Sequence, residues 1–421
     1  MRSMRAAGAL SYPAFVRFWI ADAVSNLGTF TSTLAIQLLL IETLHADQTE
    51  IGLVRAAQWL PSLMFGLLVG VLIDRMRRRT VLIAADAAAG IVTALIAVLA
   101  LTGALTVGLL VAAVFAVGIA MLFSTAARQS FLPDLVPVPV LPAASARLEQ
   151  TWTAAQSAGP LVGGALVRFL SAPIAVLVDA MSWVISAVVL IRVRVSEHPP
   201  APVAGRSVVR ELREGAGWLY RHPTLKWYAV SLHLWFFFNS AVNTVLIYFA
   251  TTELRQSALA VGFALACAGI TGFVAAGLSP RLGARFGVGT MCAVADWLTP
   301  LGYLLVVFAV PGPAAIWWLV AGQAVFGFGL GLKGPLETSY RNAVAPERLR
   351  GRMNGCMRTF NWGAIAVSAP LAGWAAATWG NRPTIGVAIG GLALAALLLT
   401  LSPFRAAVLP PEQLPGVTPA Q

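Results

Sequence analysis

Residues 70–79 read Gly70-Val71-Leu72-Ile73-Asp74-Arg75-Met76-Arg77-Arg78-Arg79 and stand between two long apolar runs. Four arginines within five residues cannot lie in hydrocarbon, so this turn marks the water side of a membrane. Loops rich in Lys and Arg stay on the cytoplasmic side, so the turn also predicts which way the protein faces. We therefore expect a membrane protein with this loop inside the cell.

The composition supports a membrane location and argues against other classes. The chain has 421 residues, of which 58% are hydrophobic and 11% charged, whereas soluble domains are about 25% charged. Its net charge is +12, but the arginines are scattered over short loops, so nucleic-acid binding is not expected. The three cysteines fall in or beside apolar runs at spacings unlike metal sites, which indicates packing roles. Neither a cofactor nor a metal is expected.

Apolar runs of about 20 residues recur along the chain, each long enough to cross about 30 Å of hydrocarbon. The twelve predicted spans are residues 14–41, 51–73, 81–102, 107–128, 149–170, 174–192, 223–249, 257–279, 288–309, 314–336, 352–378 and 383–404. Loops on one side hold most of the arginines, and loops on the other hold only Arg255 and Arg382. This asymmetry predicts a multi-pass protein of the cell membrane with both termini in the cytoplasm. The N-terminus lacks a signal-peptide core, so the first span is expected to stay as an anchor.

The longest polar segment separates six spans from six. We predict an N-terminal six-helix bundle over 1–192, a cytoplasmic linker over 193–222, a C-terminal six-helix bundle over 223–405 and a disordered cytoplasmic tail over 406–421. Within the linker, residues 208–215 are expected to form a short surface helix with Arg and Glu outward.

The two halves are weakly alike. Moving the second half back by 210 positions places Asp296 on Asp86 and Trp362 on Trp152, together with several prolines and glycines at equivalent span positions. One gap-free offset that aligns rare residues indicates two parallel repeats. Such pseudo-symmetric halves are typical of secondary transporters, whose substrate sites lie at the repeat interface.

With this repeat, the loop quoted above resembles a motif of the major facilitator superfamily. The pattern consists of Gly70, Leu72, Asp74, Arg75, Arg78 and Arg79, with Arg77 where the family has glycine. The resemblance implies an all-α membrane protein with twelve transmembrane helices in two pseudo-symmetric six-helix bundles. It also implies that Gly70, Asp74, Arg75, Arg78 and Arg79 form a latch between the halves. The second copy of the motif has lost its acid, since Ala284 stands where the first has Asp74.

A second segment, in the fifth span, looks like the motif of proton-driven exporters. It contains Gly159, Pro160, Gly163 and Gly164, which permit a bend and close helix contact; ordinary packing of small residues is the alternative. Other segments, such as residues 127–137, 179–183 and 344–352, resemble the drug and siderophore exporter branch that includes macrolide efflux proteins and the enterobactin exporter. The resemblance covers roughly residues 12–405.

Ionisable groups inside a span cost about 2.5–3.5 kcal/mol or more, so each needs a reason. Asp22, Asn26, Thr29 and Thr33 follow one another at helical spacing and form a polar stripe, which is expected to line the central cavity. Asp22 is the first candidate for proton coupling, and an Asp held in a permanent hydrogen-bond network is the alternative. Asp179 is the second candidate, with a role as a hydrogen-bond acceptor equally open.

Asp86 and Asp296 each follow an arginine of the loop motifs by eleven residues. We predict that they pair with loop arginines and belong to the latch. Lys333 lies among glycines in the tenth span; it is expected to bind an anionic substrate, to pair with an acid such as Asp22 or Glu337, or to extend to the interface.

The remaining cavity candidates are polar or aromatic residues of the fifth and seventh spans. An aromatic-lined cavity with a few polar groups suits bulky amphipathic compounds. The candidates are Trp152, Gln156, His233, Asn239 and Asn243. A packing role is the alternative for His233.

These features predict a proton-coupled exporter of small amphipathic molecules that works by alternating access. Its partners would be a small-molecule substrate, protons and the lipid bilayer, and one chain would suffice as a monomer. The alternative within the same fold is a transporter of lysophospholipid or another lipid. An enzyme is not expected, because neither a nucleophile with a base nor a phosphate-binding loop is found. A channel is disfavoured by the two-half repeat.

Overall fold

The computed structural model describes residues 9–73, 75–193, 195 and 208–408, and over these residues it forms thirteen α-helices and no strand. The first six are α1 (Pro13–Leu38), α2 (Gln48–Ile73), α3 (Arg78–Leu101), α4 (Val107–Leu135), α5 (Leu141–Phe169) and α6 (Ala172–Ile191). The others are α7 (Val208–Arg221), α8 (Leu225–Tyr248), α9 (Ala258–Phe286), α10 (Val288–Val307), α11 (Ala315–Val344), α12 (Glu347–Trp379) and α13 (Asn381–Leu401). All but α7 correspond to predicted spans. The predicted tail from 409 onward and the linker over 196–207 lie outside the described residues.

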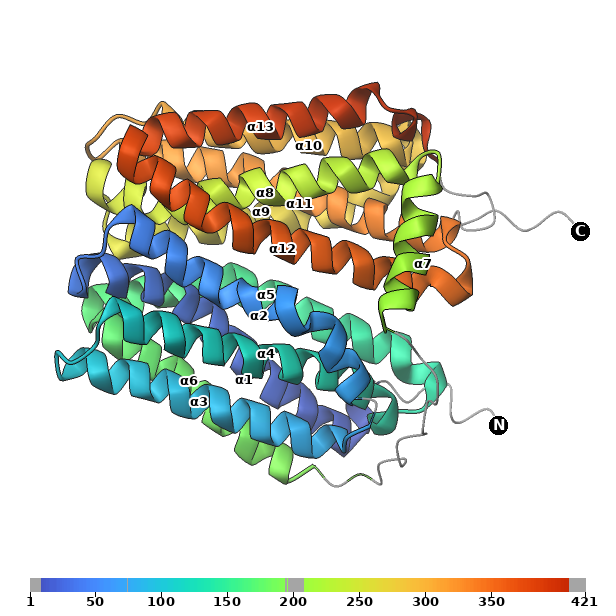
Figure 1. Ribbon diagram of the computed structural model, residues 1–421, viewed down its shortest axis with the longest axis horizontal. Coiled ribbons are helices and arrows are strands. Elements are labelled where there is room, and N and C mark those ends of the chain that lie inside the picture. Colours follow the sequence, from blue (N-terminus) through green and yellow to red (C-terminus); the bar gives the residue numbers. More distant parts are fainter. Residues whose placement is uncertain (1–8, 74, 194, 196–207, 409–421) are drawn as a thin grey trace, which may run out of the picture. The chain divides into compact units, whose positions relative to one another are not determined.

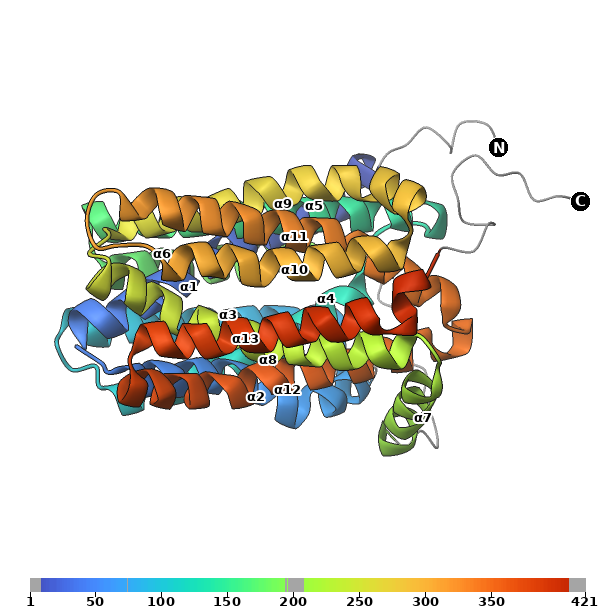
Figure 2. The same ribbon diagram turned by 90° about the horizontal axis from the view of Figure 1, so that it is seen from above.

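The chain divides into two compact units. One contains residues 1–46 and 57–205, and the other contains residues 47–56 and 206–421, so that the first turns of α2 belong to the second unit. In the first unit, α1 packs against α5 and α6, and α3 packs against α4 and α6. In the second, α8 packs against α12 and α13, and α10 packs against α11 and α13 (Figures 1 and 2). The packing order is therefore the same in both.

Backbone details repeat as well. The π-helical turn Leu39–Thr43 after α1 has its counterpart in Phe249–Glu253 after α8, again 210 positions on. The left-handed residue His45, at φ 49°, is matched by Arg255 at φ 56°. Non-glycine residues seldom adopt this conformation, so its recurrence at one offset supports the predicted repeat.

Many large apolar side chains point outward. Ile91, Phe273 and Trp317 are 68%, 67% and 69% exposed, respectively. Nine of the helices in the described part of the chain are long and apolar enough to cross a membrane. An outward apolar surface on helices of this length is typical of segments surrounded by lipid.

Helices approach closely where glycines face a neighbour. A Cβ on Gly163 of α5 would lie 2.5 Å from the Thr31 carbonyl oxygen of α1. Likewise, a Cβ on Gly327 of α11 would lie 1.9 Å from the Ala268 carbonyl oxygen of α9. Because no other residue fits at such distances, these glycines set the helix separation in each unit.

Helix α7 is the predicted surface helix, and it extends to Arg221. It runs across the end of α12 in Figure 1, where Glu214 accepts hydrogen bonds from Arg348 at 3.3 Å and from Arg352. Burial raises the pKa of Tyr220 to about 12, so its hydroxyl stays protonated and can donate to Nε2 of His233 at 2.9 Å. These contacts fix the surface helix to α8 and α12.

Candidate functional site

Asp22 and Asn26 lie one turn apart on α1, on the face directed into the first unit. The carboxyl of Asp22 is nearly buried, with 9% of the residue exposed. Its Oδ2 accepts a hydrogen bond from Nδ2 of Asn26 at 2.8 Å, and its Oδ1 lies 2.9 Å from Nη1 of Arg128 on α4. The polar stripe predicted on α1 therefore begins with an ion pair.

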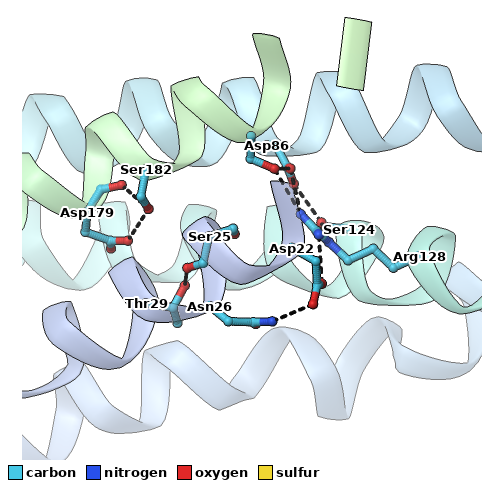
Figure 3. A network of polar contacts seen from close by, with 10 residues as sticks. Asp22, Ser25, Asn26, Thr29, Asp86, Ser124, Arg128, Asp179 and Ser182 are labelled. Carbon is cyan, nitrogen blue, oxygen red and sulfur yellow. Dashed lines mark hydrogen bonds and ion pairs between the residues drawn. The ribbon is translucent and has the colours of Figure 1, made fainter. Parts of the chain in front are cut away.

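Arg128 reaches between two carboxylates (Figure 3). Its Nη2 lies 2.7 Å from Oδ2 of Asp86 on α3, a residue with no exposed surface. Asp86 also accepts hydrogen bonds from Ser124 at 2.7 Å and from Ser186 at 2.6 Å. Thus one guanidinium from α4 joins α1 and α3, and hydroxyls of α4 and α6 complete the shell around Asp86. We call Asp22, Asp86 and Arg128 the acid–arginine cluster.

The charges of this cluster do not balance. With both acids ionised, two negative charges face one positive charge in a largely buried site. An uncompensated charge in a low-dielectric site is unfavourable, and a carboxyl can remove it by taking up a proton. Asp86 is held by three donors and Asp22 by two, one of them a neutral amide. Asp22 is therefore the acid better placed to exchange a proton.

The second unit has an ion pair at the equivalent helices. Nζ of Lys333 on α11 lies 2.6 Å from Oδ1 of Asp296 on α10. The ammonium also lies 5.7 Å from the ring centre of Tyr228 and 5.6 Å from that of Trp235, within the range of cation–π attraction. A second carboxylate that acts on this ammonium, Glu337, lies on α11 and accepts a hydrogen bond from Tyr228. The residue 210 positions after Asp22 is Leu232, so Asp22 has no acid at its equivalent position.

The prediction that Asp86 and Asp296 pair with loop arginines is wrong. They pair with Arg128 and Lys333, which lie inside α4 and α11. Lys333 is only 5% exposed, so it does not extend to the interface; of its predicted roles, pairing with an acid is found, and the acid is Asp296. In both cases the basic residue lies several turns inside a helix, where its charge needs a partner, and the nearest acid is on the neighbouring helix.

Asp179 of α6 is 4% exposed and lies apart from the acid–arginine cluster (Figure 3). Its Oδ1 accepts a hydrogen bond from Ser182 at 3.3 Å. It lines a cavity of the first unit together with Thr29 and Thr33, the two threonines of the polar stripe predicted on α1. The hydroxyls of these two threonines also bond to carbonyl groups of their own helix.

The polar candidates of α8 form two local networks. Nδ1 of His233 donates to Oδ1 of Asn361 at 2.7 Å, besides the contact of its Nε2 with Tyr220. The Tyr303 hydroxyl donates to Oδ1 of Asn239 at 2.7 Å and accepts from Nδ2 of Asn243 at 3.2 Å. The structure gives each of these side chains a partner within the second unit, and their contact with substrate stays a prediction.

The fifth-span candidates lie where α5 meets α1. Gly159 and Gly163 are buried against α1, so the predicted close contact of this motif is found. Pro160 lies inside α5, and Gly164 is also buried.

Trp152 is 40% exposed and packs edge-on against Phe30 at 5.5 Å. Gln156 is half-buried one turn further on.

The loop motif makes contacts inside the first unit. Nη1 of Arg78 lies 3.0 Å from Oδ2 of Asp134 at the end of α4, and Arg79 donates from Nε to the Leu190 carbonyl oxygen at 3.2 Å. Gly70 is part of α2, and Arg75 is exposed. Asp74 lies outside the described residues, so the acidic member of the predicted latch is not placed.

Arg128 is the member of the candidate site that sequence reasoning missed. It was the last residue of a predicted span and so resembled an interfacial arginine, whereas α4 continues to Leu135. The available signal was the pair Ser124 and Arg128, which lie four residues apart and so share one helix face. A helix face that carries a serine and an arginine inside a span is expected to pack against acids of neighbouring helices, because the buried arginine needs a negative partner.

Comparison with known proteins gives the family. The model of the transmembrane secretion effector family, a branch of the major facilitator superfamily, matches residues 5–412. The chain belongs to this family. One relative is the multidrug efflux pump Tap of Mycolicibacterium fortuitum, which is 25% identical over 337 residues, 78% of this chain and 81% of that protein.

Solved structures show the same fold. A bacterial homologue of the iron transporter ferroportin in its inward-facing state has a TM-score of 0.74 at 14% identity and covers 93% of this chain and 98% of its own. The nucleoside transporter NupG has a TM-score of 0.72 at 13% identity, with coverages of 92% and 98%. By its family and its fold, the protein is an all-α, multi-pass membrane transporter with the major facilitator fold of twelve transmembrane helices in two bundles.

Proposed function

We propose that this protein exports small amphipathic molecules, such as a drug, an antibiotic or a siderophore, by alternating access, and that proton entry drives the export. The observation that carries the proposal is the acid–arginine cluster, in which two buried carboxylates share one guanidinium. The family and the similarity to a multidrug efflux pump support export as the direction. No comparable excess of acid is needed for a transporter that only lets its substrate diffuse.

Coupling follows from the charge balance. A proton on Asp22 leaves Asp86 and Arg128 as a neutral pair, which tolerates a dry, occluded site. Loss of that proton restores the excess negative charge, which is stable only where water reaches the cluster. Protonation of Asp22 therefore favours the occluded conformation, and deprotonation favours a conformation in which water reaches the cluster. A proton gradient can then drive the change between these conformations, as alternating access requires.

The other predicted properties go with this function. We place the protein in the cell membrane as a monomer with both termini in the cytoplasm, because the arginine-rich loops fall on that side. The bundle boundaries at 192 and 223, and the latch formed by the loop motif, remain predictions. Movement of lysophospholipid or another lipid is the competing outcome of the test below.

The test uses the full chain reconstituted in vesicles that contain a pH dye. An inward proton gradient is imposed, and chemically diverse compounds are screened for proton flux. We expect flux that depends on a compound, that is lost in Asp22→Asn, and that is retained in Asp47→Asn, because Asp47 is an exposed acid that only caps α2. Compound or lysophospholipid movement without proton flux would overturn the coupling.

A further inference from the structure

Asp179 is a buried acid that the proton cycle above does not use. Within the described part of the chain, no Lys, Arg or His lies within ion-pair distance of its carboxyl. The side chains that hydrogen-bond to it, those of Ser182, Ser32 and Trp183, are all neutral. A carboxylate that is only 4% exposed and has no cation is unfavourable, so the site requires a positive charge or a proton from outside the fold.

The fold makes room for this carboxyl. Gly28 of α1 faces it, and a Cβ at that position would lie 2.7 Å from Oδ1 of Asp179 and 2.0 Å from Oγ of Ser182. Any other residue at position 28 would therefore displace the acid. The carboxyl occupies a place that α1 leaves open for it.

A cavity adjoins the carboxyl. About 30 Å³ of its space is open to water, which holds about two water molecules. Thr29, Thr33, Thr93 and Trp183 line it, together with apolar side chains of α1, α3 and α4. Carboxylate and hydroxyl oxygens accept hydrogen bonds from an ammonium, and an indole face attracts a cation.

We propose that Asp179 and this cavity form the subsite for the positively charged group of a cationic amphipathic substrate. The inference rests on the proposed export of amphipathic molecules and names their class. The space fits a primary or singly methylated ammonium that replaces about two waters, while the apolar body of the substrate stays outside the cavity. A bulky quaternary ammonium is too large for it.

Two features favour a cationic group over a second coupled proton. A proton bound to a carboxyl needs no adjoining space, whereas this carboxyl adjoins a cavity whose wall also contains three threonines. The acid–arginine cluster already supplies a proton site in the same unit. In this proposal, Asp179 binds the charged group of the substrate and Asp22 binds the proton that drives export.

The test measures binding without any gradient. Full-length protein in lipid nanodiscs is titrated at pH 7 with decylammonium and with decanol, which has the same chain but no charge, by isothermal titration calorimetry. We expect Asp179→Asn to weaken decylammonium binding at least tenfold and to leave decanol unchanged. Thr93→Val, which keeps the shape of a cavity wall but removes its hydroxyl, should weaken decylammonium alone by several-fold; it also serves if Asp179→Asn does not fold. Asp47→Asn is the matched control.

Equal affinities of wild type for the two probes, or an Asp179→Asn protein that binds both as wild type does, would overturn the subsite. Equal loss of both probes would do so as well, because it indicates a structural role. The outcome is separate from that of the vesicle assay. Proton flux with neutral compounds and no effect of Asp179 removes the subsite alone, whereas Asp179-dependent cation binding without proton flux removes the proposed coupling alone.

Discussion

Replacing Arg128 by methionine would remove the one positive charge that two buried acids share. At 2.9 and 2.7 Å, each contact contributes about 6 kcal/mol of Coulomb attraction at an effective dielectric constant of about 20. Desolvation of the three charges offsets most of this, because each ion costs several kcal/mol to bury. What remains on breaking such a site is a loss of about 3–5 kcal/mol in the free energy of unfolding. We expect this loss for Arg128→Met at pH 7.

The contrast with Asp22→Asn makes the prediction specific. That variant leaves a balanced pair of Asp86 and Arg128, so it should lose about 1 kcal/mol or less. The double variant should recover part of the loss caused by Arg128→Met, since one of the two unpaired charges is gone. The defect of Arg128→Met should also shrink as the pH falls, because protonated carboxyls carry no charge.

The assay is unfolding in mixed micelles, followed by tryptophan fluorescence as the denaturing detergent is increased. Free energies are compared among wild type, both single variants and the double variant. If Arg128→Met is as stable as wild type at pH 7, or if Asp22→Asn costs as much as Arg128→Met, the charge imbalance does not exist in the folded protein. The proposed coupling would then lose its physical basis.

Two further predictions concern packing and the second charge pair. Gly163→Ala should cost about 1–3 kcal/mol in the same unfolding assay, because its Cβ would approach a carbonyl oxygen of α1 to 2.5 Å; equal stability with Gly108→Ala, whose Cβ meets nothing within 4 Å, would contradict this. Lys333→Met should cost about 3–5 kcal/mol by leaving Asp296 unpaired, and adding Asp296→Asn should restore most of it. A double variant no more stable than the single one would show that the pair is not the cause.

Hydropathy predicted the number and order of the membrane helices, because apolar length is what lipid requires. It did not predict where the helices end. The span predicted over 107–128 continues as helix to Leu135, and the one over 314–336 continues to Val344. Hydropathy detects the apolar part of a helix, whereas backbone hydrogen bonding continues through polar turns that lie in water beyond the hydrocarbon. Arg128 was misjudged for this reason.

The partners of the buried charges could not be predicted either. Helical spacing gives the face on which Asp86 lies, but Arg128 is 42 residues away and on another helix. The same holds for Asp296 and Lys333, which are 37 residues apart. Which faces meet depends on how closely the helices approach, and this depends on glycines whose neighbours the sequence does not name. Asp22 and Asp179 were found because an acid in an apolar run is conspicuous by itself.

The constant offset between the two halves bears on how the protein arose. The π-helical turns, the left-handed residues and the third-helix acids all recur at the same spacing, as expected if a six-helix unit was duplicated and the two copies kept equal lengths between these points. Asp86 and Asp296 then descend from one acid of the original six-helix unit. Asp22 and Asp179 have no such twins, since Leu232 and Ile389 stand at their places. The proposed proton site and the proposed substrate subsite therefore both lie in the first half, and the second half carries an uncharged residue at each equivalent position.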